Sequence, residues 1–208
     1  MKKKIKNNLN RWFNKHTNDF YTREAFKKKL RARSWYKLSQ INKKDKLFKK
    51  NMIIIDLGSA PGGWSKYAVK KTNIKKSLII SNDILPMKPI NGINFIKGDI
   101  KRKSIKNKLI KSINKKKIDL LMSDMSPNIS GIPSIDIPKS INLIKLATKI
   151  AKKILKKEGK MLIKAFQSKE LNDYLKYIHT LFKIVKIRKP YASKISSREI
   201  YILATNKI

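Results

Sequence analysis

The chain has 208 residues, no cysteine and two histidines, and its 52 Lys and Arg against 13 Asp and Glu give a formal net charge of +39. This composition excludes disulfides, thiolate metal sites and a His-rich metal site, and no apolar run reaches the roughly 20 residues that cross a bilayer. Because the basic start MKKKIKNNLN also has no apolar stretch after it, we expect a cytoplasmic, metal-free protein whose charge favours RNA or DNA over a membrane as its partner.

Part of this charge is compositional. Lys, Ile and Asn are abundant and Ala is scarce, which is typical of an AT-rich coding sequence. A lysine outside a motif is therefore as readily a solvated surface residue as a binding one. A high positive charge also disfavours self-association away from nucleic acid, so we expect a monomer.

The first 50 residues are the most basic part of the chain and predict a helical extension. Residues 19–30 (DFYTREAFKKKL) are typical of a short helix. Residues 34–41 (SWYKLSQI) predict a second helix with Trp35, Leu38 and Ile41 on its apolar face. We expect this extension, residues 1–50, to precede one domain over residues 51–208.

From residue 52 onward, short apolar runs alternate with helical stretches, which indicates an α/β doubly wound sheet. The runs predict strands at 52–56, 77–83, 93–99, 118–124, 160–166, 182–188 and 199–205. Helices are predicted at 64–71, 103–114, 138–156 and 169–181. The connection between the last two strands, 189–198, is too short for a helical crossover, so we expect an antiparallel pairing there.

Aspartates gather where the predicted strands end. Four of the first five strands end in one: Asp56, Asp83, Asp99 and Asp124. Ligands of such sheets bind outside the carboxyl ends of the strands, and acidic residues are rare in this chain. We therefore interpret these strand ends as the edge of a ligand site, although Asp99 alone is equally compatible with a solvated turn.

The first strand leads into a glycine-rich turn, GSAPGGWS, at residues 58–65. Its glycines allow a close approach of the backbone to a ligand, and the helix that starts near Trp64 attracts an anionic group. The turn matches neither G-x-G-x-x-G nor the P-loop, whose lysine is absent, so a ligand carboxylate fits it as well as a phosphate.

The acids beyond this turn suit an adenosine. Asp83 lies about 20 residues after Gly62, the spacing at which an acid typically bonds ribose hydroxyls, and Asp99 can accept from an exocyclic amine. A cofactor that carries adenosine but no phosphate group fits, so we predict S-adenosylmethionine. NAD is the alternative, but the chain lacks the glycine motif that binds the NAD pyrophosphate.

A single lysine stands inside the apolar strand MLIKAF. Burial lowers the pKa of a lysine, and a neutral amine is a general base, so we interpret Lys164 as a candidate base that Glu199 positions. The alternative is that Lys164 has no catalytic role and extends its ammonium group from the strand into solvent.

Six segments resemble the RrmJ/FtsJ (RlmE) family of bacterial 23S ribosomal RNA uridine 2′-O-methyltransferases, and they span about residues 18–205. They are RARSWYK at 31–37, DLGSAPGGWS at 56–65, NDILPM at 82–87, MSDMSPNISG at 122–131, VKIRKP at 185–190 and SREIY at 197–201. The resemblance implies a Rossmann-like class I methyltransferase with a seven-stranded, mostly parallel sheet and a reversed last strand. It also implies S-adenosylmethionine as cofactor and, as substrate, a uridine 2′-hydroxyl in the A-loop of 23S rRNA in the large ribosomal subunit.

The family's residue roles carry over by motif. The catalytic set falls on Lys37, Asp124, Lys164 and Glu199. The cofactor contacts fall on Gly62, Trp64, Asp83, Asp99 and Asp124. We expect Lys164 to be the general base, with its pKa lowered by burial and by Lys37, while Asp124 and Glu199 orient the two amines. The basic and aromatic residues near this set predict RNA contacts for the extension and its surroundings, at Arg31, Arg33, Tyr36, Arg188 and Lys189.

Other functions stay open at this point. The same four residues serve methyltransferases of the tRNA anticodon loop and of the mRNA cap. From a different class, a non-catalytic RNA-binding factor of ribosome assembly could keep the fold. A DNA-binding protein is the third alternative, but the sequence has no helix-turn-helix, zinc or zipper pattern.

Overall fold

The computed structural model describes residues 19–194 and 196–208, and the N-terminal lysines that we expected to extend an RNA groove lie outside them. The helices of the described part are α2 (Phe20–Lys27), α3 (Ser34–Asp45), α4 (Gly63–Lys71), α5 (Lys103–Ser112), α6 (Pro133–Ile154) and α7 (Lys169–His179). Its strands are β1 (Ile53–Leu57), β2 (Leu78–Asp83), β3 (Ile93–Lys97), β4 (Ile118–Ser123), β5 (Leu155–Phe166), β6 (Phe182–Arg188) and β7 (Glu199–Lys207).

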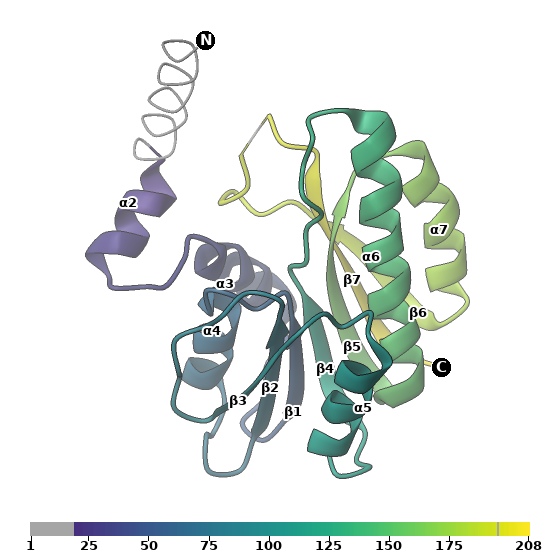
Figure 1. The fold of residues 1–208 in the computed structure, drawn as a ribbon. Helices are drawn as coiled ribbons and strands as arrows, with labels where there is room; N and C mark the ends of the chain where they lie inside the picture. Colours follow the sequence, from purple (N-terminus) through teal and green to yellow (C-terminus); the bar gives the residue numbers. More distant parts are fainter. Residues whose placement is uncertain (1–18, 195) are drawn as a thin grey trace.

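The strands form one seven-stranded sheet in the order β3-β2-β1-β4-β5-β7-β6 (Figure 1). Strands β1 to β5 pair in parallel, whereas β7 pairs antiparallel with both β5 and β6. The predicted α/β class, the seven strands and the reversed last strand are thereby confirmed. The carboxyl ends of β1 to β5 meet at one edge, where the strand-end aspartates stand.

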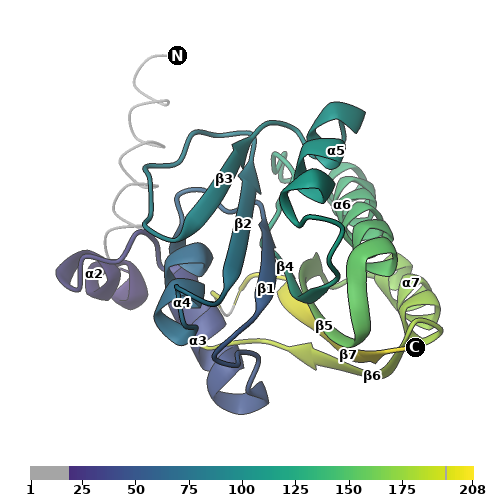
Figure 2. The same ribbon diagram turned by 90° about the horizontal axis from the view of Figure 1, so that it is seen from below.

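Helices cover both faces of the sheet (Figure 2). Alternate strand residues point to opposite faces, so Ile55 belongs to the core under α5, α6 and α7, while Ile54 belongs to the core under α3 and α4. On the second face, Leu38 and Ile41 of α3 are buried against Trp64 of α4. Helix α3 is therefore packed into the second core, and this packing sets the position of Lys37.

We predicted a helix at 138–156 and a strand at 160–166, and both bounds of the helix and the start of the strand are wrong. In the structure the helix ends at Ile154 and the strand begins at Leu155. Helix α6 begins at Pro133, because a proline fits the first turn of a helix, and Pro138 then costs only one hydrogen bond near the helix start. Strand β5 begins at Leu155, directly after α6, since an irregular register between β4 and β5 accommodates the charged residues before Lys160.

Candidate active site

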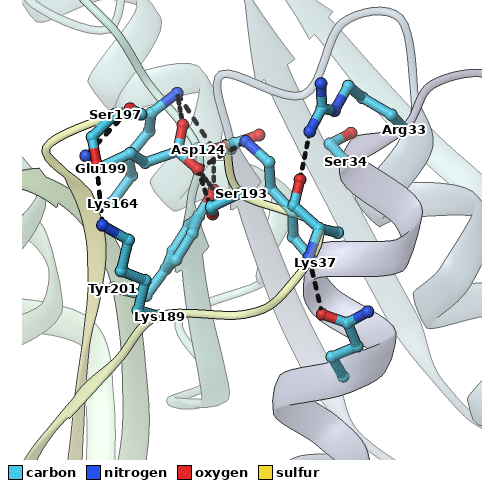
Figure 3. Close-up of polar contacts among 12 residues, drawn as sticks. Arg33, Ser34, Lys37, Asp124, Lys164, Lys189, Ser193, Ser197, Glu199 and Tyr201 are labelled. Atoms are coloured by element: carbon cyan, nitrogen blue, oxygen red, sulfur yellow. Dashed lines mark hydrogen bonds and ion pairs between the residues drawn. The ribbon is translucent and has the colours of Figure 1, made fainter. Parts of the chain in front are cut away.

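The four residues of the implied catalytic set come from four separate elements and meet at the carboxyl edge of the sheet (Figure 3). Lys37 lies on α3, Asp124 directly follows β4, Lys164 lies on β5 and Glu199 begins β7. The Nζ of Lys37 is 2.5 Å from Oε1 of Glu199. The Nζ of Lys164 is 3.1 Å from Oε2 of Glu199 and 3.6 Å from Oδ1 of Asp124. The structure thus brings two ammonium groups and two carboxylates together.

Two further side chains complete this cluster, and we did not predict either from the sequence. The hydroxyl of Tyr201 lies 3.0 Å from Asp124 Oδ1 and 3.1 Å from Glu199 Oε1, and the hydroxyl of Ser193 donates to Glu199 Oε1 at 2.8 Å. Burial, followed by the charges of Asp124 and Glu199, raises the pKa of Tyr201 well above its usual value, so the phenol keeps its proton. A signal existed for Tyr201: residues two apart in a strand share a face.

The charges in this cluster correct one prediction. Burial opposes ionisation of Glu199, but the ammonium groups of Lys164 and Lys37 outweigh it and lower the pKa of Glu199 to about 2. Burial likewise opposes the ammonium form of Lys164, yet the carboxylates of Asp124 and Glu199 outweigh burial and raise the pKa of Lys164. The expected lowering of the Lys164 pKa is therefore wrong for the free protein, because two carboxylates face this amine.

A cavity of about 590 Å³ opens beside this cluster. Such a volume lies in the range of small-molecule sites. Three of the predicted cofactor residues, Asp83, Asp99 and Asp124, line it. The remaining lining residues are Gly58, Ala60, Asn82, Ile84, Leu85, Gly98, Ile100, Lys101, Met125, Ser126, Pro127, Asn128, Lys139, Asn142 and Leu143. Asp124 belongs to both the cavity and the cluster, so it joins the two.

The cavity carboxylates also shape the loops around it. Asp83 accepts from the backbone N–H of Ala60 at 2.8 Å and of Leu85 at 2.9 Å, and Asp99 accepts from the N–H of Lys101 at 2.9 Å. Each ionised carboxylate can accept more hydrogen bonds than these. Ligand groups that fit are therefore donors and cations, and S-adenosylmethionine offers ribose hydroxyls, amines and a sulfonium.

The two predicted cofactor residues of the glycine turn lie outside the cavity lining. Gly62 precedes α4 with a φ of 106°, a conformation that favours glycine, and an added Cβ would lie 2.8 Å from Ile90. The side chain of Trp64 is 2% exposed, and its indole N–H donates to the backbone carbonyl of Ser34 at 2.9 Å. A cofactor contact of Trp64 therefore requires its backbone.

Asp56, the first strand-end aspartate, is fully buried behind the glycine turn. Its Oδ2 accepts from the hydroxyl of Ser65 at 2.6 Å, and that hydroxyl is 2.7 Å from the hydroxyl of Ser81. Its Oδ1 has no hydrogen-bond partner within the described residues. Burial, which the hydrogen bond from Ser65 offsets only in part, raises the pKa of Asp56 to about 7.

The residues that we predicted to contact RNA have partners within the protein. Arg31 donates to the carbonyls of Pro61, Lys88 and Pro89, and Arg33 pairs with Asp19 and donates to the carbonyl of Ala192. Arg188 forms a two-pronged pair with Asp45, and Lys189 donates to the carbonyl of Ser197. The ring of Tyr36 packs against Tyr21 and Trp35. Their RNA contacts stay predictions, and the structure adds a bracing role for the three arginines.

The Arg188–Asp45 pair gives a test of that bracing role. The Nε and Nη2 atoms of Arg188 lie 2.7 and 2.6 Å from the carboxylate of Asp45, whose side chain is 6% exposed. We expect Arg188→Ala to lower the free energy of unfolding by about 2–3 kcal/mol in a denaturant titration, because it leaves a buried carboxylate without its cation.

Lys186→Ala, at an exposed lysine of the same strand, is the matched control and should leave stability unchanged. Unchanged stability in Arg188→Ala would contradict the brace. An RNA contact by Arg188 predicts a different result, a weaker affinity for RNA with a salt dependence reduced by about one ion.

Within the described ranges, no three His, Asp or Glu side chains are grouped so that they could hold a metal ion. The same residues include no helix that is long and apolar enough to cross a membrane.

The comparisons with known proteins identify a family and a similar fold. A family model of FtsJ-like methyltransferases matches residues 30–207. The fold is also similar to that of a crystal structure from Plasmodium falciparum, described as a ribosomal RNA methyltransferase, with a TM-score of 0.77 and 30% sequence identity. That match covers 85% of this chain and 98% of the other.

Proposed function

The chain belongs to the FtsJ-like methyltransferase family, and on this basis we propose that it transfers a methyl group from S-adenosylmethionine to a uridine ribose 2′-hydroxyl in the A-loop of 23S rRNA. The observation that carries the proposal is that Asp124 belongs to both the cavity and the charged cluster. It lines the cavity, and its Oδ1 lies 3.6 Å from the Nζ of Lys164. The description of the Plasmodium protein supports ribosomal RNA as the substrate class.

Different cavity residues would hold different parts of the cofactor. The cofactor supplies an electrophilic methyl group when it is bound. Asp83 would accept from its ribose hydroxyls and Asp99 from its adenine amine, and the glycine turn, whose Gly58 and Ala60 line the cavity, would lie toward its carboxylate. Asp124 would lie beside the positive charge. The enzyme then has two tasks, to align the 2′-oxygen with the methyl carbon and to remove the hydroxyl proton.

Lys164 is the base in this proposal, and it must first lose its own proton. In the free protein Asp124 and Glu199 favour the ammonium form. Because Asp124 also lines the cavity, a cation bound there offsets one of these two carboxylates and lowers the pKa of Lys164. Lys37 supports the same change, since it holds Glu199 at 2.5 Å and partly neutralises the second carboxylate.

This arrangement predicts a pH profile. With both substrates below their KM, kcat/KM reports the free protein, in which the pKa of Lys164 is raised. We therefore expect kcat/KM to rise about tenfold per pH unit from pH 7 to pH 9 without a plateau, because only the deprotonated amine accepts a proton. Initial-rate measurements over this range check it, and a plateau that begins below pH 8 would contradict the raised pKa.

A methylation assay separates the candidate functions. The protein is incubated with labelled S-adenosylmethionine and large ribosomal subunits, naked 23S rRNA or bulk tRNA, and ribose methylation is mapped by nuclease digestion and mass spectrometry. We expect label at a single uridine 2′-oxygen of the A-loop. Label on tRNA alone would overturn the ribosomal assignment, and binding of RNA without any label would favour an assembly factor.

A further inference from the structure

Residues 190–193, in the connection between β6 and β7, are held next to the catalytic cluster by several contacts. The hydroxyl of Ser193 donates to Glu199 at 2.8 Å, inside the cluster (Figure 3). The backbone of Ala192 is held by α3 and by the residue that precedes this helix, because its N–H donates to Gln40 at 3.0 Å and its carbonyl accepts from Arg33. These residues are therefore an ordered part of the site.

Within residues 190–193, Tyr191 is the exposed side chain. It occupies the second position of a turn that the N–H of Ser193 closes by donating to the carbonyl of Pro190 at 2.8 Å. Its side chain is 89% exposed and has no hydrogen bond or ring contact within the described residues. Because residues two apart are separated by at most about 7 Å between Cα atoms, the backbone of Tyr191 lies near that of Ser193, whose hydroxyl binds Glu199.

The charges around Tyr191 favour a polyanion. The connection between β6 and β7 contains Lys189, Lys194 and Arg198 and no acidic residue. An aromatic ring on a backbone that is already ordered offers a large contact area at a small entropic cost, since tyrosine has two side-chain torsions. Bases of single-stranded RNA stack on such rings, and cations beside the ring hold the phosphates.

We propose that Tyr191 stacks on the base of a nucleotide that flanks the methylated ribose. This inference rests on the proposed function, because it assumes that a single-stranded RNA segment reaches Lys164 and Glu199. Tyr36, for which we predicted stacking from the sequence, has a ring that packs against Tyr21 at 5.3 Å and Trp35 at 5.2 Å. Tyr191 is instead available, so it selects and orients the strand while Lys164 and Asp124 act on the ribose.

Equilibrium binding to a fluorescently labelled A-loop oligonucleotide tests the contact independently of catalysis. We expect Tyr191→Ala to raise the Kd by about 5- to 150-fold, the range for loss of one base–aromatic stack, with an unchanged salt dependence. Tyr191→Phe should stay within about twofold of the parent, because stacking needs the ring and not the hydroxyl. Tyr177→Ala, an exposed tyrosine on α7, is the matched control and should have no effect.

A series of oligonucleotides with one abasic position each identifies the stacked base. On the oligonucleotide that lacks the stacked base, the parent protein should bind as weakly as Tyr191→Ala, so the parent and the variant should have equal Kd values. A Kd of Tyr191→Ala within about twofold of the parent on the intact oligonucleotide overturns the inference. A parent protein that shows this stack but does not methylate rRNA would overturn the proposed function alone.

Discussion

Replacement of Lys164 by alanine abolishes methyl transfer in our scheme, with kcat reduced by about 10²–10⁴-fold, the usual contribution of a general base. The affinity for S-adenosylmethionine should change little, because Lys164 does not line the cavity while Asp83, Asp99 and Asp124 do. Lys164→Arg should not restore turnover, since a guanidinium stays protonated at working pH. Single-turnover kinetics together with cofactor titration calorimetry measure both quantities.

Lys156→Ala provides the matched control for this experiment. Lys156 lies on the same strand as Lys164 and forms its own ion pair, with Asp119 at 2.6 Å, but it is half exposed and lies near the opposite end of the strand. Its replacement should leave kcat unchanged. Normal turnover in Lys164→Ala would contradict the base assignment, and lost cofactor binding would show that Lys164 instead holds Asp124 in place.

The buried carboxyl of Asp56 should dominate the pH dependence of stability around neutrality. Its folded pKa of about 7 lies above that of an unfolded aspartate, so the folded state binds the proton more tightly. Its contribution therefore favours folding at low pH and is lost as pH rises from about 4 to about 7, by roughly 4 kcal/mol in total. In urea titrations of the cofactor-free protein, the stability of Asp56→Asn relative to the parent should rise by that amount over this interval.

A second carboxylate and a control variant make this test specific. Glu199, with a pKa of about 2, contributes stability above about pH 4.5 that is lost as pH falls toward 2, so it acts in a separate window. Asp173→Asn, at an exposed acid on α7, is the control for the substitution itself. A difference between Asp56→Asn and the parent that does not vary with pH would contradict the raised pKa of Asp56.

Local pattern was sufficient to predict the architecture. Strand and helix periodicities depend on neighbouring residues, so the α/β class and all seven strands follow from apolar runs such as MIIID at 52–56. The reversed last strand follows from the length of one connection. The meeting of Asp83, Asp99 and Asp124 could be predicted because parallel strands place their carboxyl ends at the same edge of the sheet, whereas Asp56 is buried behind the glycine turn.

Quantities that depend on several distant residues were decided only by the tertiary structure. The pKa of Lys164 rises because Asp124 and Glu199, 40 and 35 positions away in the chain, lie beside it, and no local pattern contains that sum of charges. Arg33 and Arg188 look like phosphate ligands in the sequence, but the fold pairs them with Asp19 and Asp45.

The same limit applies to exposure near the site. Tyr36 and Tyr191 both stand in basic segments of the sequence, and only the packing of α2 and α3 covers one ring and leaves the other open. Asp83, Asp99, Asp124 and Lys164 could thus be singled out from residue type and position in or after strands, which are local properties, whereas Lys37 was predicted only through the family resemblance. Their protonation, their partners and their accessibility required the fold, because each depends on groups that come together only when distant elements pack.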